Sequence, residues 1–253
     1  MLLRMKTKLL PVLVLSLAWA GVGIAQKASP APASAVSSAA ASAPKPPSPQ
    51  DDLKQVLAKM NQAATSFKSA QADFEFDNFT KDFDEHDIQK GQIYFRRAGK
   101  EVDVAIHVAW KVTKFVLYKD GKISLYEPAI NQVTEKIVGK NKSDVEAVMN
   151  LGFGGSGDEL VKSFDVTMEG WETVDGVKTA RLRLVGKSED LKKLFKSAVL
   201  WIDPERDVPL KQQFFASVGD YRLNHYTGIK LNAKLGNDLF QLKTKPNTQI
   251  VRP

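Results

Sequence analysis

The hydrophobic pattern of the chain changes its period near residue 67. Before that point, apolar residues recur three or four positions apart at Leu53, Val56, Leu57, Met60 and Ala64. This spacing predicts an amphipathic helix, and Asp51 or Asp52 is placed to cap its first turn. After residue 67 the period becomes two, which is typical of strands with one apolar face. The sequence therefore predicts a leading helix followed by a sheet.

Alternation continues through most of the remaining chain and predicts about ten antiparallel strands. Asp120-Gly121 and Asp175-Gly176 each separate two alternating runs, and such dipeptides favour tight two-residue hairpins. This estimate rests on thirteen runs, several of only three or four residues, at 72–77, 92–97, 102–108, 115–118, 123–126, 133–138, 164–168, 171–174, 180–184, 199–202, 210–215, 221–230 and 240–242.

One region interrupts the alternation and predicts two short helices. Ser143 is placed to cap the first helix, within 141–153, and the second is expected at 158–162. The glycine-rich segment 152–157 lies between them, and we expect it to be a mobile link. It is not followed by Gly-Lys-Ser/Thr, so the pattern does not favour a phosphate-binding loop.

Together these elements predict an α+β fold in a single domain, residues 51–253. A long antiparallel meander must hide its apolar face, either by closing into a barrel or by curving round helices. The order of the elements favours a curved, incomplete antiparallel barrel of about ten strands. The leading helix and the short helices would cover its open side.

The first 25 residues predict a cleaved export signal. Three positive charges precede a nearly unbroken apolar run over 9–20, and small residues at 23–25 suit a signal peptidase. An uncleaved membrane anchor is the alternative, but the run is short for a span, which needs about 20 strongly apolar residues. Residues 26–50 include 20 Ala, Pro and Ser residues, a composition that predicts a disordered spacer.

Charge and cysteine content exclude several classes of function. The chain has 36 basic and 29 acidic residues, but five of the basic ones precede Asp51, which leaves 31 against 29 in the expected domain. A nucleic-acid binder would carry a concentrated basic surface, so we expect no nucleic-acid partner. The chain has no cysteine, which excludes cysteine nucleophiles, thiolate metal sites and a lipid-modified N-terminal cysteine.

Candidate catalytic and metal-ligating residues are few. The acidic run 82–87 includes His86, but it lacks the ligand spacing of a calcium loop. We therefore expect a solvated turn there, and no metal or cofactor. The other two histidines lie within predicted strands. A secreted enzyme that uses carboxylates such as Asp84, Glu85 and Asp203 is an alternative that the sequence leaves open.

Arg97 is a charged exception on an apolar strand face. It has the same parity as Ile93 and Phe95, and a buried guanidinium must be paired or hydrogen-bonded. At the mouth of a curved sheet, Arg97 could hold a covering helix through that helix's C-terminal carbonyls. The alternative is a frayed strand end that lets Arg97 reach solvent.

Four stretches of the sequence carry a resemblance to a known family. They are the leading helix with the strand start at 53–74, Gly-Gln-Ile-Tyr-Phe-Arg-Arg at 91–97, 118–128 with 132–134, and the C-terminal 240–251. In this order and spacing they resemble the periplasmic lipoprotein carrier family, the LolA type. The resemblance covers 51–253 and implies an incomplete barrel with a helical lid over an apolar cavity. It implies a soluble periplasmic carrier, which we expect to be a monomer without catalytic residues.

The resemblance also implies partners and site residues. The partners are acylated lipoproteins, an inner-membrane lipoprotein-releasing transporter and an outer-membrane acceptor. Arg97 takes the place of the family's lid-locking arginine, although Ala98 replaces the usual proline and Glu101 stands near an apolar family position. A carrier of free lipid or glycolipid with the same cavity is the alternative. The expected cavity and lid residues are Phe74, Phe76, Ile93, Phe95, Val104, Ile106, Leu117, Ile123, Leu125, Val148, Met149, Phe153, Leu182 and Leu184.

Overall fold

The computed structural model describes residues 48–99, 101–139, 142–151, 153–216 and 219–253. The expected signal, 1–25, and the spacer up to residue 47 lie outside the described residues. Among the described residues, no helix combines the length and the apolar composition that a membrane crossing needs. The helices are α1 (Pro49–Ser66), η1 (Lys81–Phe83), α2 (Lys142–Met149), α3 (Gly157–Ser163), α4 (Glu189–Leu194) and η3 (Asn237–Phe240). The strands are β1 (Ser69–Thr80), β2 (Glu85–Ala98), β3 (Glu101–Val108), β4 (Lys114–Lys119), β5 (Lys122–Glu127), β6 (Gln132–Ile137), β7 (Phe164–Val174), β8 (Val177–Gly186), β9 (Ser197–Asp203), β10 (Val208–Phe215), β11 (Tyr221–Leu231) and β12 (Gln249–Val251).

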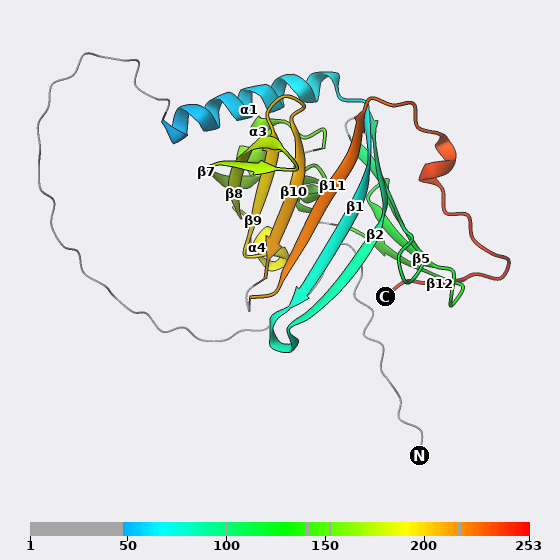
Figure 1. Ribbon diagram of the computed structural model, residues 1–253. Helices are drawn as coiled ribbons and strands as arrows, with labels where there is room; N and C mark the ends of the chain where they lie inside the picture. The colour runs from blue at the N-terminus through cyan, green and yellow to red at the C-terminus, as the bar shows by residue number, and fades with distance from the viewer. Residues whose placement is uncertain (1–47, 100, 140–141, 152, 217–218) are drawn as a thin grey trace, which may run out of the picture.

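The twelve strands of the described region join one sheet. β1 to β6 form one meander and β7 to β11 another, and the two meet where β1 pairs with β11. β12 adds to β6 in parallel. In the described part, the two edge strands, β12 and β7, do not pair with each other, so the sheet is not closed. The sheet curls beneath α1, which lies across its upper end (Figure 1). The expected α+β fold with an incomplete, curved antiparallel barrel is confirmed.

Both predicted two-residue hairpin turns are present. Asp120 and Gly121 have φ angles of 52° and 69°, and Asp175 and Gly176 have 51° and 79°, as a type I′ turn requires. The acidic run 82–87, expected as a solvated turn, is a turn only in its first half, because β2 begins at Glu85 and Glu85 pairs with Thr80 of β1.

The two faces of the sheet carry separate apolar clusters. We call the face that packs against α1 to α4 the concave face; its two clusters include Val56 and Met60 of α1 and Met149 of α2. We call the opposite face the outer face; it carries smaller clusters around Trp201 and around Phe240. The helices therefore cover the larger apolar face, and the outer face is mostly solvated.

Two helix caps differ from the prediction. α1 begins at Pro49 because Ser48, rather than Asp51 or Asp52, is its N-cap residue. The Ser48 hydroxyl accepts from the backbone N of Asp51 at 3.3 Å, and the Asp51 carboxylate accepts from the backbone N of Ser48 at 3.3 Å. This reciprocal pair is a capping box. Ser143 lies inside α2 rather than at its cap.

The C-terminal segment is not the strand expected at 240–242. Phe240 ends η3 instead, and its ring is 1% exposed beneath Arg96, whose guanidinium carbon lies 4.1 Å from the ring centroid. The tail then crosses the outer face, where the backbone N of Lys245 donates to the Tyr126 hydroxyl at 3.1 Å. It ends in β12, which pairs with β6 at the edge of the sheet, so the tail covers part of the outer face.

Candidate functional site

Arg97 ties the end of β2 to the end of α1. Its Nε donates to the carbonyl of Phe67 at 3.1 Å, and its Nη2 donates to the carbonyls of Ala64 at 3.3 Å and Gly154 at 2.8 Å. These include the helix-end carbonyls that the sequence analysis assigned to it. Gly154 has a φ of 80°, and an added Cβ would lie 2.4 Å from the Phe67 ring, so this position needs glycine.

The segment between α2 and α3 places an aromatic ring inside the concave face. We call residues 150–151 and 153–155 the lid loop. Phe153 is 1% exposed; its ring stacks on Phe95 with centroids 4.5 Å apart and meets Tyr226 edge-on at 5.2 Å. The described part of this glycine-rich segment is therefore a packed plug, rather than the mobile link that its composition predicted.

Two buried polar residues that the sequence analysis missed hold the lid loop from β10 and β11. Gln212 is 5% exposed, and its Nε2 donates to the carbonyl of Leu151. Its Oε1 accepts from the Tyr226 hydroxyl at 2.9 Å and from Asn224 Nδ2 at 3.3 Å. Burial raises the pKa of Tyr226 well above its usual range, so the hydroxyl keeps its proton and acts as the donor.

α1 and α3 approach each other without a side chain between them. Gly157 faces the carbonyl of Leu57, and an added Cβ would lie 2.4 Å from that oxygen. Beside this contact, Asn61 and Asp158 exchange two hydrogen bonds, each 3.0 Å long. The two helices are therefore joined both by close backbone packing and by hydrogen bonds.

α2 is also bound to the sheet by partly buried polar contacts. The Tyr118 hydroxyl donates to Glu146 at 3.2 Å, and Lys142 pairs with Glu101 and lies 3.6 Å from Glu146. Burial, with the Glu146 charge beside it, raises the pKa of Tyr118. Glu101, which stands near an apolar position of the resembled family, thus joins β3 to α2.

The structure places most of the expected cavity residues on the concave face, in two clusters. The first cluster contains Phe74, Phe76, Ile93, Phe95, Val104, Ile106, Ile123, Leu125, Met149 and Phe153. The second contains Val148, Leu182 and Leu184. Leu117 is the exception: it packs on the outer face, because its neighbours Val116 and Tyr118 take the concave positions of β4. That these residues bind a ligand stays a prediction.

The concavity is filled in this structure. Apart from Ile123, the first-cluster residues are 1% to 8% exposed, because the helices and the lid loop cover them. Filling is expected, since the lining of an empty apolar cavity loses its dispersion contacts. A pocket of about 590 Å³ lies elsewhere, on the outer face beside Leu117, Lys122 and Leu242. The expected cavity is therefore not open here, and a guest would have to displace the cover.

The carboxylates of the enzyme alternative are not brought together. Asp84 lies in the β1–β2 turn, and Asp203 ends β9, with β10 and β11 between. Asp203 accepts from the backbone N of Glu205 at 2.9 Å and pairs with Arg206 at 2.6 Å, so it closes the β9–β10 turn. No group of three or more His, Asp or Glu side chains in the described part could hold a metal ion.

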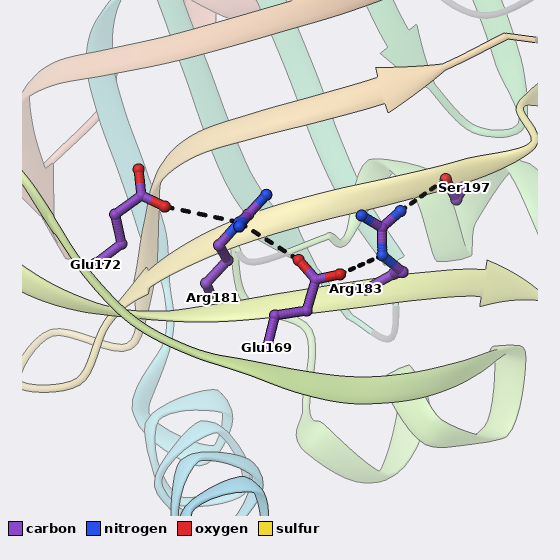
Figure 2. A network of polar contacts seen from close by, with 5 residues as sticks. All are labelled: Glu169, Glu172, Arg181, Arg183 and Ser197. Atoms are coloured by element: carbon purple, nitrogen blue, oxygen red, sulfur yellow. Dashed lines mark hydrogen bonds and ion pairs between the residues drawn. The ribbon is translucent and has the colours of Figure 1, made fainter. Parts of the chain in front are cut away.

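A charged network covers the outer face of β7 and β8 (Figure 2). Glu169 pairs with Arg183 and lies 3.4 Å from Arg181, which is 3.6 Å from Glu172. Arg183 also donates to Ser197 at 3.3 Å. Half-exposed pairs of this kind contribute about 0–1 kcal/mol to stability. We therefore interpret the network as part of a solvated face rather than as a reactive centre.

Comparison with known proteins finds similar structures, although no family model and no curated protein matches the chain. An uncharacterized conserved protein from Thermus thermophilus is 12% identical and covers 80% of this chain and 99% of its own, with a TM-score of 0.50. MucB is 15% identical over 79% of this chain and 65% of its own, with a TM-score of 0.48. A LolA superfamily protein from Nitrosomonas europaea is 13% identical over 75% and 97%, with a TM-score of 0.38. At these identities the likeness concerns the fold alone.

Proposed function

We propose that this chain is a soluble periplasmic carrier that shields the acyl chains of lipoproteins between the inner and the outer membrane. The observation that supports this most is the Arg97 latch, which holds α1 and the lid loop over an apolar sheet face. In the proposed cycle an inner-membrane transporter loads the carrier, the carrier travels as a monomer, and an outer-membrane acceptor unloads it. The cycle needs neither a catalytic residue nor a cofactor.

The energetics of the guest explain why a carrier needs both an apolar face and a cover. Each methylene removed from water contributes about 0.8 kcal/mol, so one sixteen-carbon chain contributes on the order of 12 kcal/mol. A carrier that bound this tightly could not unload. A cover that competes for the same face lowers the net affinity by the free energy of opening. The strength of the latch therefore sets how readily the guest leaves.

The substitution Arg97→Leu tests the latch. It removes three hydrogen bonds from the closed state, each with a net contribution of about 1 kcal/mol. We expect the open form to become more populated, the affinity for an acylated peptide to rise about tenfold or more, and release to slow by a similar factor. The measurement is the transfer rate of a fluorescent triacylated lipopeptide from the carrier to acceptor vesicles.

Arg183→Leu is the matched control, because it removes an arginine from the outer face and leaves Glu169 with Arg181 as its partner. We expect transfer by this variant to equal that of the unchanged protein. An Arg97→Leu variant that releases the lipopeptide at the original rate would contradict the proposed role of the latch.

The nature of the guest separates the proposal from its alternative, a carrier of free lipid or glycolipid. The same concave face could accept either class, since both present acyl chains. Mass spectrometry of the molecules that copurify from the native host distinguishes them. Acylated proteins support the proposal, whereas free lipids alone favour the alternative.

A further inference from the structure

A hydrogen-bonded polar cluster lies within the apolar concave face. Gln212 and Tyr226 are 5% and 3% exposed, and the rings of Phe76 and Phe153 meet Tyr226 edge-on with centroids 6.3 and 5.2 Å away. Polar groups are unfavourable in such surroundings unless they are hydrogen-bonded. The partners of this cluster therefore indicate what the site is built to hold.

The neighbours of Gln212 fix the orientation of its amide. The Oε1 accepts from two donors, the Tyr226 hydroxyl and Asn224 Nδ2. This leaves Nε2 to point at the lid loop, where it donates to the main-chain carbonyl of Leu151. The sheet thus presents one oriented hydrogen-bond donor toward the space that the lid loop fills.

The lid loop fills that space with two chemically different groups. One is the ring of Phe153, stacked on Phe95; the other is the carbonyl of Leu151, on Gln212. An acyl chain linked through an ester or an amide offers the same pair, an apolar tail and a carbonyl oxygen. A plain hydrocarbon offers only the tail, and an ether-linked chain adds only a weaker acceptor oxygen.

We propose that the lid loop is an internal mimic of the guest, and that Gln212 is a recognition subsite for the carbonyl of an ester- or amide-linked acyl chain. This inference rests on the proposed carrier function and narrows the class of guest. When the lid loop leaves, Gln212 Nε2 loses its acceptor. A guest carbonyl restores the hydrogen bond, whereas a guest without one leaves the buried donor unsatisfied or only weakly bonded.

The test compares methyl palmitate with methyl hexadecyl ether, which differ by the carbonyl. Each displaces a lipophilic fluorescent probe from the full-length protein, and the ratio of the two affinities is measured. We expect the ester to bind about tenfold more tightly, as one buried hydrogen bond implies. In Gln212→Met the ratio should fall to about one, even though freeing the lid loop raises both affinities.

Arg97→Leu is the control, because it loosens the lid without touching the subsite and should keep the ratio of the unchanged protein. Equal affinities for ester and ether in the unchanged protein would overturn the inference. So would a Gln212→Met variant that keeps the ester-to-ether ratio of the unchanged protein. Either result leaves the carrier function standing. If neither compound binds, the carrier function itself is overturned. Should Gln212→Met fail to fold, the ratios of the unchanged protein and of Arg97→Leu decide.

Discussion

Asp207, in the β9–β10 turn, carries a buried carboxylate oxygen with no hydrogen-bond partner among the described atoms. Burial raises the pKa of this carboxyl from 3.8 to about 6, against the opposing charge of Lys59. The folded protein therefore binds this proton more tightly than the unfolded chain does. Protonation of Asp207 therefore contributes to the free energy of unfolding. This contribution is present in full below the unfolded pKa of 3.8 and is lost as the pH rises through about 6.

Asp207→Asn should accordingly stabilise the protein at neutral pH. The amide removes the buried charge and suits the left-handed φ of 52°. We expect a gain of about 1 kcal/mol at pH 7.5, after allowing for the partial exposure of the group, and a flatter stability profile between pH 4 and 6. Urea unfolding across this range measures both. Asp84→Asn, at an exposed position with a φ of 49°, should change neither.

Single residues of the candidate site differed in how far the sequence could predict them. Arg97 was predictable, because a guanidinium on an apolar face needs acceptors and a helix end supplies carbonyls. Gln212 was not, because a bulge between Pro209 and Lys211 breaks the alternation of β10. Leu117 was assigned to the wrong face, since a six-residue strand with apolar residues on both sides does not reveal its parity.

Among the connecting elements, the lid loop depends on Gly154, which packs against Phe67 at the end of α1. Gly154→Ala would force a Cβ against the Phe67 ring and place alanine in a left-handed conformation, which by itself costs about 1–2 kcal/mol. We expect the loop to leave the concave face more often and the affinity for acylated peptides to rise. Hydrogen exchange of residues 150–155, together with lipopeptide binding, measures this.

Gly176→Ala provides the comparison, because Gly176 has a φ of 79° but no atom within 4 Å of an added Cβ. It shares the backbone strain and lacks the clash. If the amides of the lid loop exchange at the same rate in the two variants, the packing of Gly154 is not what holds the loop.

The elements themselves were predictable where their pattern was long. The strands show period two because one face packs against helices and the other meets solvent. The six-residue α4 and the four-residue η3 are too short for a helical period to register. The start of α1 was misplaced, because Ser48 lies in a stretch whose composition resembles a spacer and gives no sign of its cap.

At the scale of the whole molecule, the C-terminal tail stabilises the outer face independently of the lid. Phe240 is 1% exposed and packs with Tyr94 and Ala105 beneath Arg96. We expect Phe240→Ala to lower the free energy of unfolding by about 3 kcal/mol. Denaturant unfolding measures the loss. Transfer of the lipopeptide should be unchanged at temperatures where the variant is folded. A faster or slower transfer would show that the C-terminal tail and the lid loop are coupled.

The architecture could be predicted as a whole, but the state of its concavity could not. Alternation reveals that a strand has an apolar face, and the order of elements reveals that the sheet curves. Neither reveals whether side chains of the cover or a guest occupy that face, because both satisfy the same pattern. The aromatic stacking of Phe153 on Phe95 that fills it joins residues far apart in the chain.

The pairing of β1 with β11 has a bearing on how the chain acquires its shape. β1 lies near the middle of the sheet, yet its second neighbour is synthesised only when Tyr221–Leu231 has been made. Until then the growing polypeptide holds two unjoined meanders, and Ser69–Thr80 presents a long unpaired edge. Joining segments so distant is slow, because a large loop must close first. The nascent protein therefore passes through an aggregation-prone interval that ends only when its last long strand arrives.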